Sequence, residues 1–137
     1  MTDPDWPSLW ELEPGLRPPE VEYNEKLVEY GIGWQLTIEC RPLCPPIRAY
    51  GDAEMVAPYC RDAAVRWLAA TVGGCEVRYP EKVRGKVTHA VALSGPGCDP
   101  CDIGGDGGWF IAPTLDAALF AACRAVVEAR ATAGGQR

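Results

Sequence analysis

Four cysteines, arranged as two closely spaced pairs, are the residues of this chain whose types and spacing best suit chemistry. One pair, Cys98 and Cys101, lies in the glycine-dense stretch 94–108, and the other, Cys40 and Cys44, lies among prolines. Two thiolates at such a spacing can bind one Zn²⁺, and a closed structural site requires four ligands in a tetrahedron. One hypothesis is therefore a zinc site formed by all four cysteines, which would join the two loops. The other is four reduced thiols, in which case the chain needs no cofactor.

The same Cys-x-x-Cys pair allows a second kind of chemistry, with Cys98 or Cys101 as a nucleophile. A reactive thiol needs a lowered pKa, which a helix N-terminus or a neighbouring cation provides. Here Asp99 and Asp102 lie beside the two cysteines, and repulsion from carboxylates raises the pKa of a thiol. The single histidine, His89, falls in a strand-like segment with no serine nearby that could form a hydrolase triad. A small cysteine-dependent enzyme stays an alternative, and no catalytic residue is assigned.

Length, charge and hydropathy exclude several classes of protein. The 137 residues suffice for one domain with its own core. The net charge is -6, and Lys and Arg do not gather into the basic surface that nucleic acid requires. No apolar run reaches the roughly 18 residues of a membrane span, and the first residues lack the pattern of a secretory signal. We therefore expect a cytoplasmic protein that binds neither nucleic acid nor membrane.

Residues 1–20 are expected to form an arm outside the main domain. Five prolines in this segment preclude a continuous helix or strand, since proline lacks an N–H and fixes its own φ. Trp6, Leu9 and Trp10 are interspersed with acidic residues, a pattern typical of peptides that dock in the groove of a partner protein. Alternatively, the tryptophans fold back over an apolar patch of the same chain. The second arrangement is favoured because tryptophan is costly to leave in water.

The rest of the chain is expected to form one α+β domain over residues 21–131, followed by a flexible tail at 132–137. Several short segments alternate apolar and polar residues, which indicates half-buried strands. Helical stripes of apolar residues follow Asp52 and Thr114, and both residues are suitable N-caps. We expect a small mixed sheet of four or five strands packed by two main helices, as an α/β sandwich. The predicted strands are 34–40, 47–50, 75–79, 85–93 and 109–111, and the predicted helices are 22–30, 53–72 and 114–131.

The second half of the chain resembles a known family. The segment Ile111-Ala112-Pro113-Thr114-Leu115, followed by the helix pattern Ala121-Ala122-Cys123-Arg124-Ala125-Val126-Val127-Glu128-Ala129, is similar to the end of phage ABA sandwich domains. The resemblance extends over residues 53–131. It implies a small phage or prophage protein in the cytoplasm of the host cell. It supplies no catalytic residue.

These observations predict a small phage-type accessory protein that acts by binding a protein partner, with no evident catalytic activity. The predicted contact residues are Trp6, Leu9 and Trp10. The alternatives are a zinc-binding interaction module and the cysteine-dependent enzyme described above. The identity of the partner and the oligomeric state are left open by the sequence.

Overall fold

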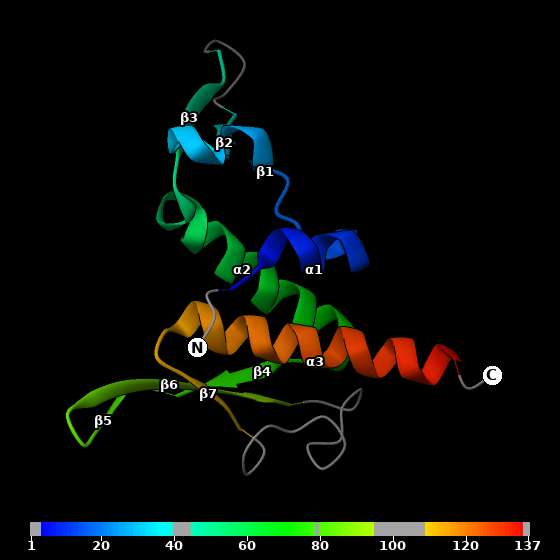
Figure 1. The fold of residues 1–137 in the computed structure, drawn as a ribbon. Coiled ribbons are helices and arrows are strands. Elements are labelled where there is room, and N and C mark those ends of the chain that lie inside the picture. Colours follow the sequence, from blue (N-terminus) through cyan, green and yellow to red (C-terminus); the bar gives the residue numbers. More distant parts are fainter. Residues whose placement is uncertain (1–3, 40–44, 79, 95–108, 136–137) are drawn as a thin grey trace.

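A computed structural model describes residues 4–39, 45–78, 80–94 and 109–135 of the protein (Figure 1). The chain has an α+β fold, as the sequence predicts, with one sheet of three strands, one of four strands, and helices between and around them. Every strand pairing in the described residues is antiparallel. No helix in this part of the chain is long and apolar enough to cross a membrane.

The first sheet consists of β1 (Val21–Tyr23), β2 (Trp34–Ile38) and β3 (Ile47–Gly51), in that spatial order. Between β1 and β2 the chain forms a short 3-10 helix, η2 (Glu25–Tyr30), where the sequence predicted a longer helix starting at residue 22. The helix starts later because residues 21–23 pair with β2. The side chain of Asn24 caps η2 by accepting a hydrogen bond from the Lys26 amide at 3.0 Å.

Helix α2 (Ala53–Val72) links the first sheet to the second and has the predicted bounds. Asp52 caps its first turn, with the Oδ1 atom accepting a hydrogen bond from the Glu54 amide at 3.1 Å. Gly73 ends the helix with a positive φ of 108°, a conformation that glycine adopts at little cost. The buried side of α2 carries the predicted apolar stripe, including Val56, Cys60, Ala64, Trp67, Leu68 and Val72.

The second sheet is built around β6 (Lys86–Leu93), with which β4 (Cys75–Val77), β5 (Glu81–Val83) and β7 (Trp109–Ala112) all pair. Helix α3 (Leu115–Gly135) runs along this sheet (Figure 1). Thr114 caps α3 as predicted, with its hydroxyl oxygen accepting a hydrogen bond from the Ala117 amide at 3.1 Å. An ion pair of 2.9 Å between Arg61 and Asp116 joins α3 to α2.

The N-terminal segment forms two short helical pieces that are separated at Glu13, so no continuous helix extends over it, as the sequence predicts. Residues Trp6–Leu12 form α1, and Pro14–Leu16 form a further 3-10 turn, η1. Pro7 lies in the first turn of α1, where an amide has no partner within the helix, so the missing N–H costs nothing. Asp5 caps the helix, and its carboxylate accepts a 2.7 Å hydrogen bond from the Ser8 hydroxyl.

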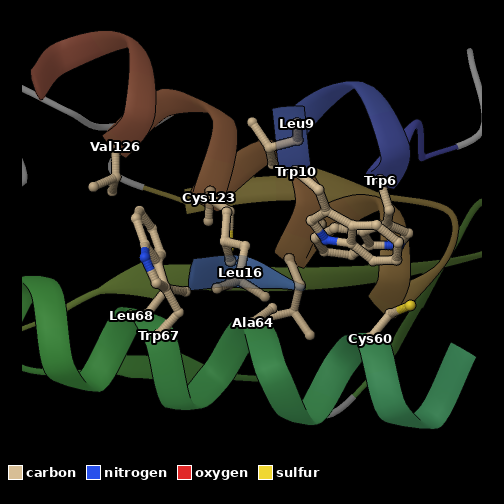
Figure 2. Close-up of a cluster of buried hydrophobic side chains, with 14 of the residues drawn as sticks. Trp6, Leu9, Trp10, Leu16, Cys60, Ala64, Trp67, Leu68, Cys123 and Val126 are labelled. Atoms are coloured by element: carbon tan, nitrogen blue, oxygen red, sulfur yellow. The ribbon is translucent and has the colours of Figure 1, made fainter. Parts of the chain in front are cut away.

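The core lies where α1 and η1 meet α2 and α3 (Figure 2). Trp6, Leu9 and Trp10 point from α1 toward the other two helices, and Leu16 of η1 fills the space beside them. Leu68 of α2 is also fully buried, as are Leu119 and Val126 of α3. Burial of a large apolar side chain contributes about 1.5–3 kcal/mol to folding, so this cluster dominates the stability of the chain.

Two further details differ from the sequence-based expectation. The strands belong to two antiparallel sheets instead of one mixed sheet, because each is built from strands close in sequence and α2 separates the two groups. Helix α3 extends to Gly135, so most of the predicted tail at 132–137 is helical. Alanine-rich sequence without proline favours this continuation.

Candidate functional site

The predicted zinc ligands Cys40, Cys44, Cys98 and Cys101 lie outside the described residues. Within the described ranges, no group of three or more His, Cys, Asp or Glu side chains could hold a metal ion. The zinc site therefore stays a prediction, and so does the alternative of a nucleophilic Cys98 or Cys101.

The cysteines that the structure does describe are unsuited to nucleophilic chemistry. Cys60 and Cys123 are free thiols buried between the helices. Burial raises the pKa of each from 9.0 to about 12, because the interior disfavours the charged thiolate. Burial also raises the pKa of Cys75. These thiols stay protonated at neutral pH, and a protonated thiol is a poor nucleophile.

A pocket of about 270 Å³ lies among α1, β2 and the first turns of α2 and α3. Its walls are mainly apolar and include Trp6 and Trp34, with carboxylates from Glu54 and Asp116. Both carboxylates lie in first helical turns, where negative charge complements the helix dipole. Asp116 is in addition neutralised by Arg61 at 2.9 Å. Glu54 and Asp116 therefore each stabilise the helix that carries them.

The predicted contact residues of the arm are part of the core. Trp6 and Trp10 are each 6% exposed, and Leu9 is 3% exposed. The Trp6 ring packs edge-to-face on Phe120 with centroids 5.2 Å apart, and Trp10 packs in the same way on Trp34 at 5.8 Å. The chain thus has the folded-back arrangement that the sequence favoured. A partner could reach these side chains only if α1 detached, and binding through them stays a prediction.

Exposed apolar side chains are concentrated in the first sheet. Figure 1 shows β1, η2, β2 and β3 together beyond one end of α2, away from the second sheet; residues 21–51 are called the projecting sheet below. Seven of the twelve large apolar side chains exposed in the described residues belong to it: Tyr23, Val28, Tyr30, Ile32, Ile38, Ile47 and Tyr50. The other five are scattered over α1, α2, β4, β6 and β7. The seven of the projecting sheet lie on both of its faces, because Ile47 and Tyr50 are an odd number of positions apart along β3.

The strand register divides the projecting sheet into an apolar and a polar face. Directly opposite residues point to the same face, so Leu36 shares one face with Val21 and Ala49. Val21 and Leu36 are buried against the body of the protein. Further along the same face, Ile38 lies opposite Ile47, and these two side chains are 40% and 56% exposed. The apolar face therefore extends beyond the part that the fold covers.

The hydrogen-bond pattern shows which backbone groups of β3 are unpaired. The Thr37 amide donates to the Glu20 carbonyl at 2.8 Å, and the Asn24 amide donates to the Gly33 carbonyl at 2.8 Å. Odd-numbered residues of β2 thus bond toward β1, and even-numbered residues bond toward β3, because successive residues of a strand point to alternate edges. Arg48 and Tyr50 lie opposite Thr37 and Gln35, which bond toward β1. The N–H and C=O groups of Arg48 and Tyr50 therefore point away from β2. Among the described residues, none is hydrogen-bonded to these four groups.

The opposite edge of the same sheet is partly closed by local contacts. Val21 directs its backbone groups away from β2, by the same alternation. Its carbonyl accepts a hydrogen bond from the Arg17 guanidinium at 2.9 Å, and its amide donates to the Pro18 carbonyl at 3.1 Å. The backbone groups of Tyr23, which point the same way, are bonded to no described residue, so the β1 edge offers one free residue and the β3 edge offers two.

The projecting sheet carries little net charge. Residues 21–51 of the sequence contain four Glu against three Lys and Arg, a net charge of -1 out of -6 for the whole sequence. Glu39 directly follows β2, and Asp52 directly follows β3.

Comparison with known proteins gives no match, whether to a family model, a curated protein or a solved structure. The resemblance of residues 53–131 to phage ABA sandwich domains accordingly stays a prediction. Sequence reasoning located β3 but missed its open edge, because the order of strands in a sheet is set by long-range pairing. The apolar residues Ile38 and Ile47, which flank the connection between the two strands, were the sequence signal that could have indicated apolar surface at this end of the sheet.

Proposed function

We propose that this protein is a protein-binding module whose projecting sheet accepts an extended segment of a partner protein at β3. The observation that supports the proposal is the open edge of β3, where Arg48 and Tyr50 present backbone groups that no described residue bonds. A partner strand would pair with these groups and extend the sheet from three strands to four. This mode of recognition uses main-chain hydrogen bonds for affinity and side-chain contacts for specificity.

The length and composition of β3 support this choice over the other edges. At five residues, β3 is longer than β1, β4, β5 and β7, which have three or four. Proteins protect edge strands with proline, charged side chains or covering segments; β3 contains no proline, and Arg48 is its single charged residue. A maintained open edge beside exposed Ile47 and Tyr50 is therefore best explained by a partner that covers it.

The expected affinity is moderate. Two donors and two acceptors would each form a hydrogen bond, and one such bond contributes about 0.5–1.5 kcal/mol net of the lost bonds to water. Contact with the exposed side chains of Ile47 and Ile38 would add apolar burial. A phage-type accessory role, which the resemblance of the second half implies, fits a small protein that acts through such a contact, and we include it in the proposal.

A single proline substitution tests the proposal. Arg48→Pro removes one of the two outward N–H groups of β3 but none of the hydrogen bonds to β2, and proline is tolerated at such edge positions. The matched control is Arg48→Ala, which removes the same side chain and keeps the N–H. We expect a partner captured from native host extract by the wild-type protein to be captured by Arg48→Ala and lost with Arg48→Pro.

The melting temperatures of both variants should stay close to that of the wild type, which shows that loss of binding is not loss of fold. Retention of every captured protein by a folded Arg48→Pro variant would rule out strand addition at β3.

A further inference from the structure

We infer that the strand added at β3 is β3 of a second copy of this chain, in a symmetric dimer with Ala49 on the two-fold axis. This inference rests on the proposed strand addition and names its occupant. The projecting sheets of the two copies would join into one antiparallel sheet of six strands. The free backbone groups, the ends of β3 and the side chains on both faces each support this occupant.

The backbone groups of β3 are complementary to themselves in this register. Antiparallel pairing with Ala49 opposite Ala49 places Arg48 of each copy opposite Tyr50 of the other. Both residues point their N–H and C=O groups outward, and two such residues placed opposite each other exchange two hydrogen bonds. The two-fold axis repeats the pair, so four hydrogen bonds form and use every free group of the two β3 edges.

The ends of β3 exclude the neighbouring registers. A shift by two residues in one direction places Tyr50 opposite Pro46, which has no N–H to donate. The same shift in the other direction places Arg48 opposite Asp52, whose carbonyl already accepts the Met55 amide at 3.2 Å as α2 begins. The inferred register avoids both conflicts and pairs β3 over its whole length.

The side chains of one face are complementary in charge. The Arg48 side chain would lie beside the ring of Tyr50 of the second copy, which is 50% exposed, and a guanidinium group is attracted to such a ring. Asp52 follows on the same face, because its backbone is extended. It is a diagonal neighbour of the incoming Arg48, at a distance that a long side chain can span. Each Arg48 would therefore meet an aromatic ring and a carboxylate.

The opposite face would bury apolar side chains. Ile47, which is 56% exposed, would lie opposite Gly51 of the second copy. Gly51 has no side chain, and Met55 packs beside it, with its sulfur 3.3 Å from the position that a Cβ atom would occupy. Ile47 of each copy would therefore contact Met55 of the other.

Antiparallel pairing also separates the rest of the two chains. β3 leads directly into α2 at its C-terminal end (Figure 1). The C-terminal ends of two antiparallel strands lie at opposite ends of the pair, so the two α2 helices would leave the dimer in opposite directions. Most of the net charge of each chain lies outside residues 21–51, whose own net charge is -1. Repulsion between the copies is therefore weak at β3.

Sedimentation of the intact protein under reducing conditions tests the dimer. We expect wild-type protein to pass from monomer to dimer between about 1 μM and 1 mM, since an interface of two short strands is small. Arg48→Ala keeps all four hydrogen bonds and should weaken the dimer less than Arg48→Pro, which removes two of them and should cost about a further tenfold in affinity. Asp52→Asn keeps the N-cap of α2 but not its charge, and should weaken the dimer at low salt.

A disulfide tests the register. Residue 49 of each copy would lie opposite itself in a non-hydrogen-bonded pair, with Cα atoms about 4.5 Å apart, a separation that a disulfide can span. Mild oxidation should therefore link two copies of an Ala49→Cys variant at position 49, as identified by mass spectrometry of the linked peptide. The matched control is Tyr50→Cys, which should not link at position 50. A link at position 50 and none at 49 would contradict the register.

A wild-type protein that stays monomeric up to about 1 mM, or a dimer that Arg48→Pro and Arg48→Ala weaken equally, would overturn the inference. Neither result decides whether another protein adds a strand at β3, which the capture experiment tests. If the inference holds, the protein captured from host extract is this same chain. Capture of a different protein that is lost with Arg48→Pro would support strand addition and reject the second copy as its occupant.

Discussion

The helical body buries most of its large apolar side chains, whereas the projecting sheet leaves several of them exposed beside unpaired backbone groups. In the body, made of α1, η1, α2, α3 and the second sheet, large apolar residues such as Leu16, Leu68 and Leu119 are at most 1% exposed. In the projecting sheet, Ile47 and Tyr50 are at least half exposed beside a free strand edge. The body contains the interactions that stabilise the chain, and the projecting sheet contains the exposed groups that the proposed function assigns to a partner.

Aromatic residues show the same contrast. On the second sheet, the guanidinium group of Arg78 covers the ring of Trp109 at 4.1 Å from its centroid. In the projecting sheet, Tyr23 packs on Trp34 at 4.8 Å near the body, but Tyr30 and Tyr50 stack on no described residue. Exposed aromatic rings lose contact with water when a partner covers them, so this difference supports the proposal that the projecting sheet is the binding side.

The largest expected effect distinguishes the two regions by stability. Trp6→Ala leaves a cavity beside Phe120 and should lower the free energy of unfolding by about 3–5 kcal/mol. The matched aromatic substitution in the projecting sheet, Tyr50→Ala, should change it by about 0.5 kcal/mol or less. Chemical denaturation of both variants provides the comparison. A Trp6→Ala variant as stable as Tyr50→Ala would mean that α1 is not part of the core, and would favour the arm as a docking peptide.

A smaller effect depends on pH and belongs to the body alone. The pKa of Cys123 rises from 9.0 in the unfolded chain to about 12 in the folded protein. Below pH 9 both states keep the proton, and stability is unaffected. Above it the unfolded chain loses a proton that the folded state retains, so the free energy of unfolding should fall by about 1.4 kcal/mol per pH unit. Cys123→Ala should remove this contribution.

The control for the pH effect is Val126→Ala, which shortens a buried neighbour on the same helix and carries no thiol. Its stability should fall with pH as steeply as that of the wild type, whereas Cys123→Ala should show a shallower slope. Parallel slopes for all three proteins would show that the Cys123 thiol does not resist ionisation in the folded state.

Local signals in the sequence predicted much of the fold. Asp52 and Gly73 mark the ends of α2, Thr114 marks the start of α3, and apolar alternation marks β2 and β3. These features depend only on residues within one or two turns along the chain, so they can be recognised in a single sequence. The short helix α1 was not predicted, because Pro7 lies in its first turn, where proline is compatible with a helix.

The candidate site was harder to predict than the elements that carry it. The division into two sheets and the open edge of β3 both depend on which strands pair across the chain. The contact residues predicted from aromatic content, Trp6, Leu9 and Trp10, are core residues in the structure. Aromatic side chains stabilise cores and interfaces by the same physics, so composition alone does not separate the two roles.

The measurement that tests the central claim most directly is residue-resolved amide hydrogen exchange of β3, in the free protein, diluted to a monomer, and with the captured partner bound. In the free protein, the amide of Ala49 should be protected by its bond to β2, while the amides of Arg48 and Tyr50 should exchange as freely as those of an unfolded chain. The bound partner should protect Arg48 and Tyr50 and leave the helical body unchanged. Arg48 and Tyr50 amides already protected in the free protein, or new protection confined to the body, would contradict the assignment of β3 as the binding edge.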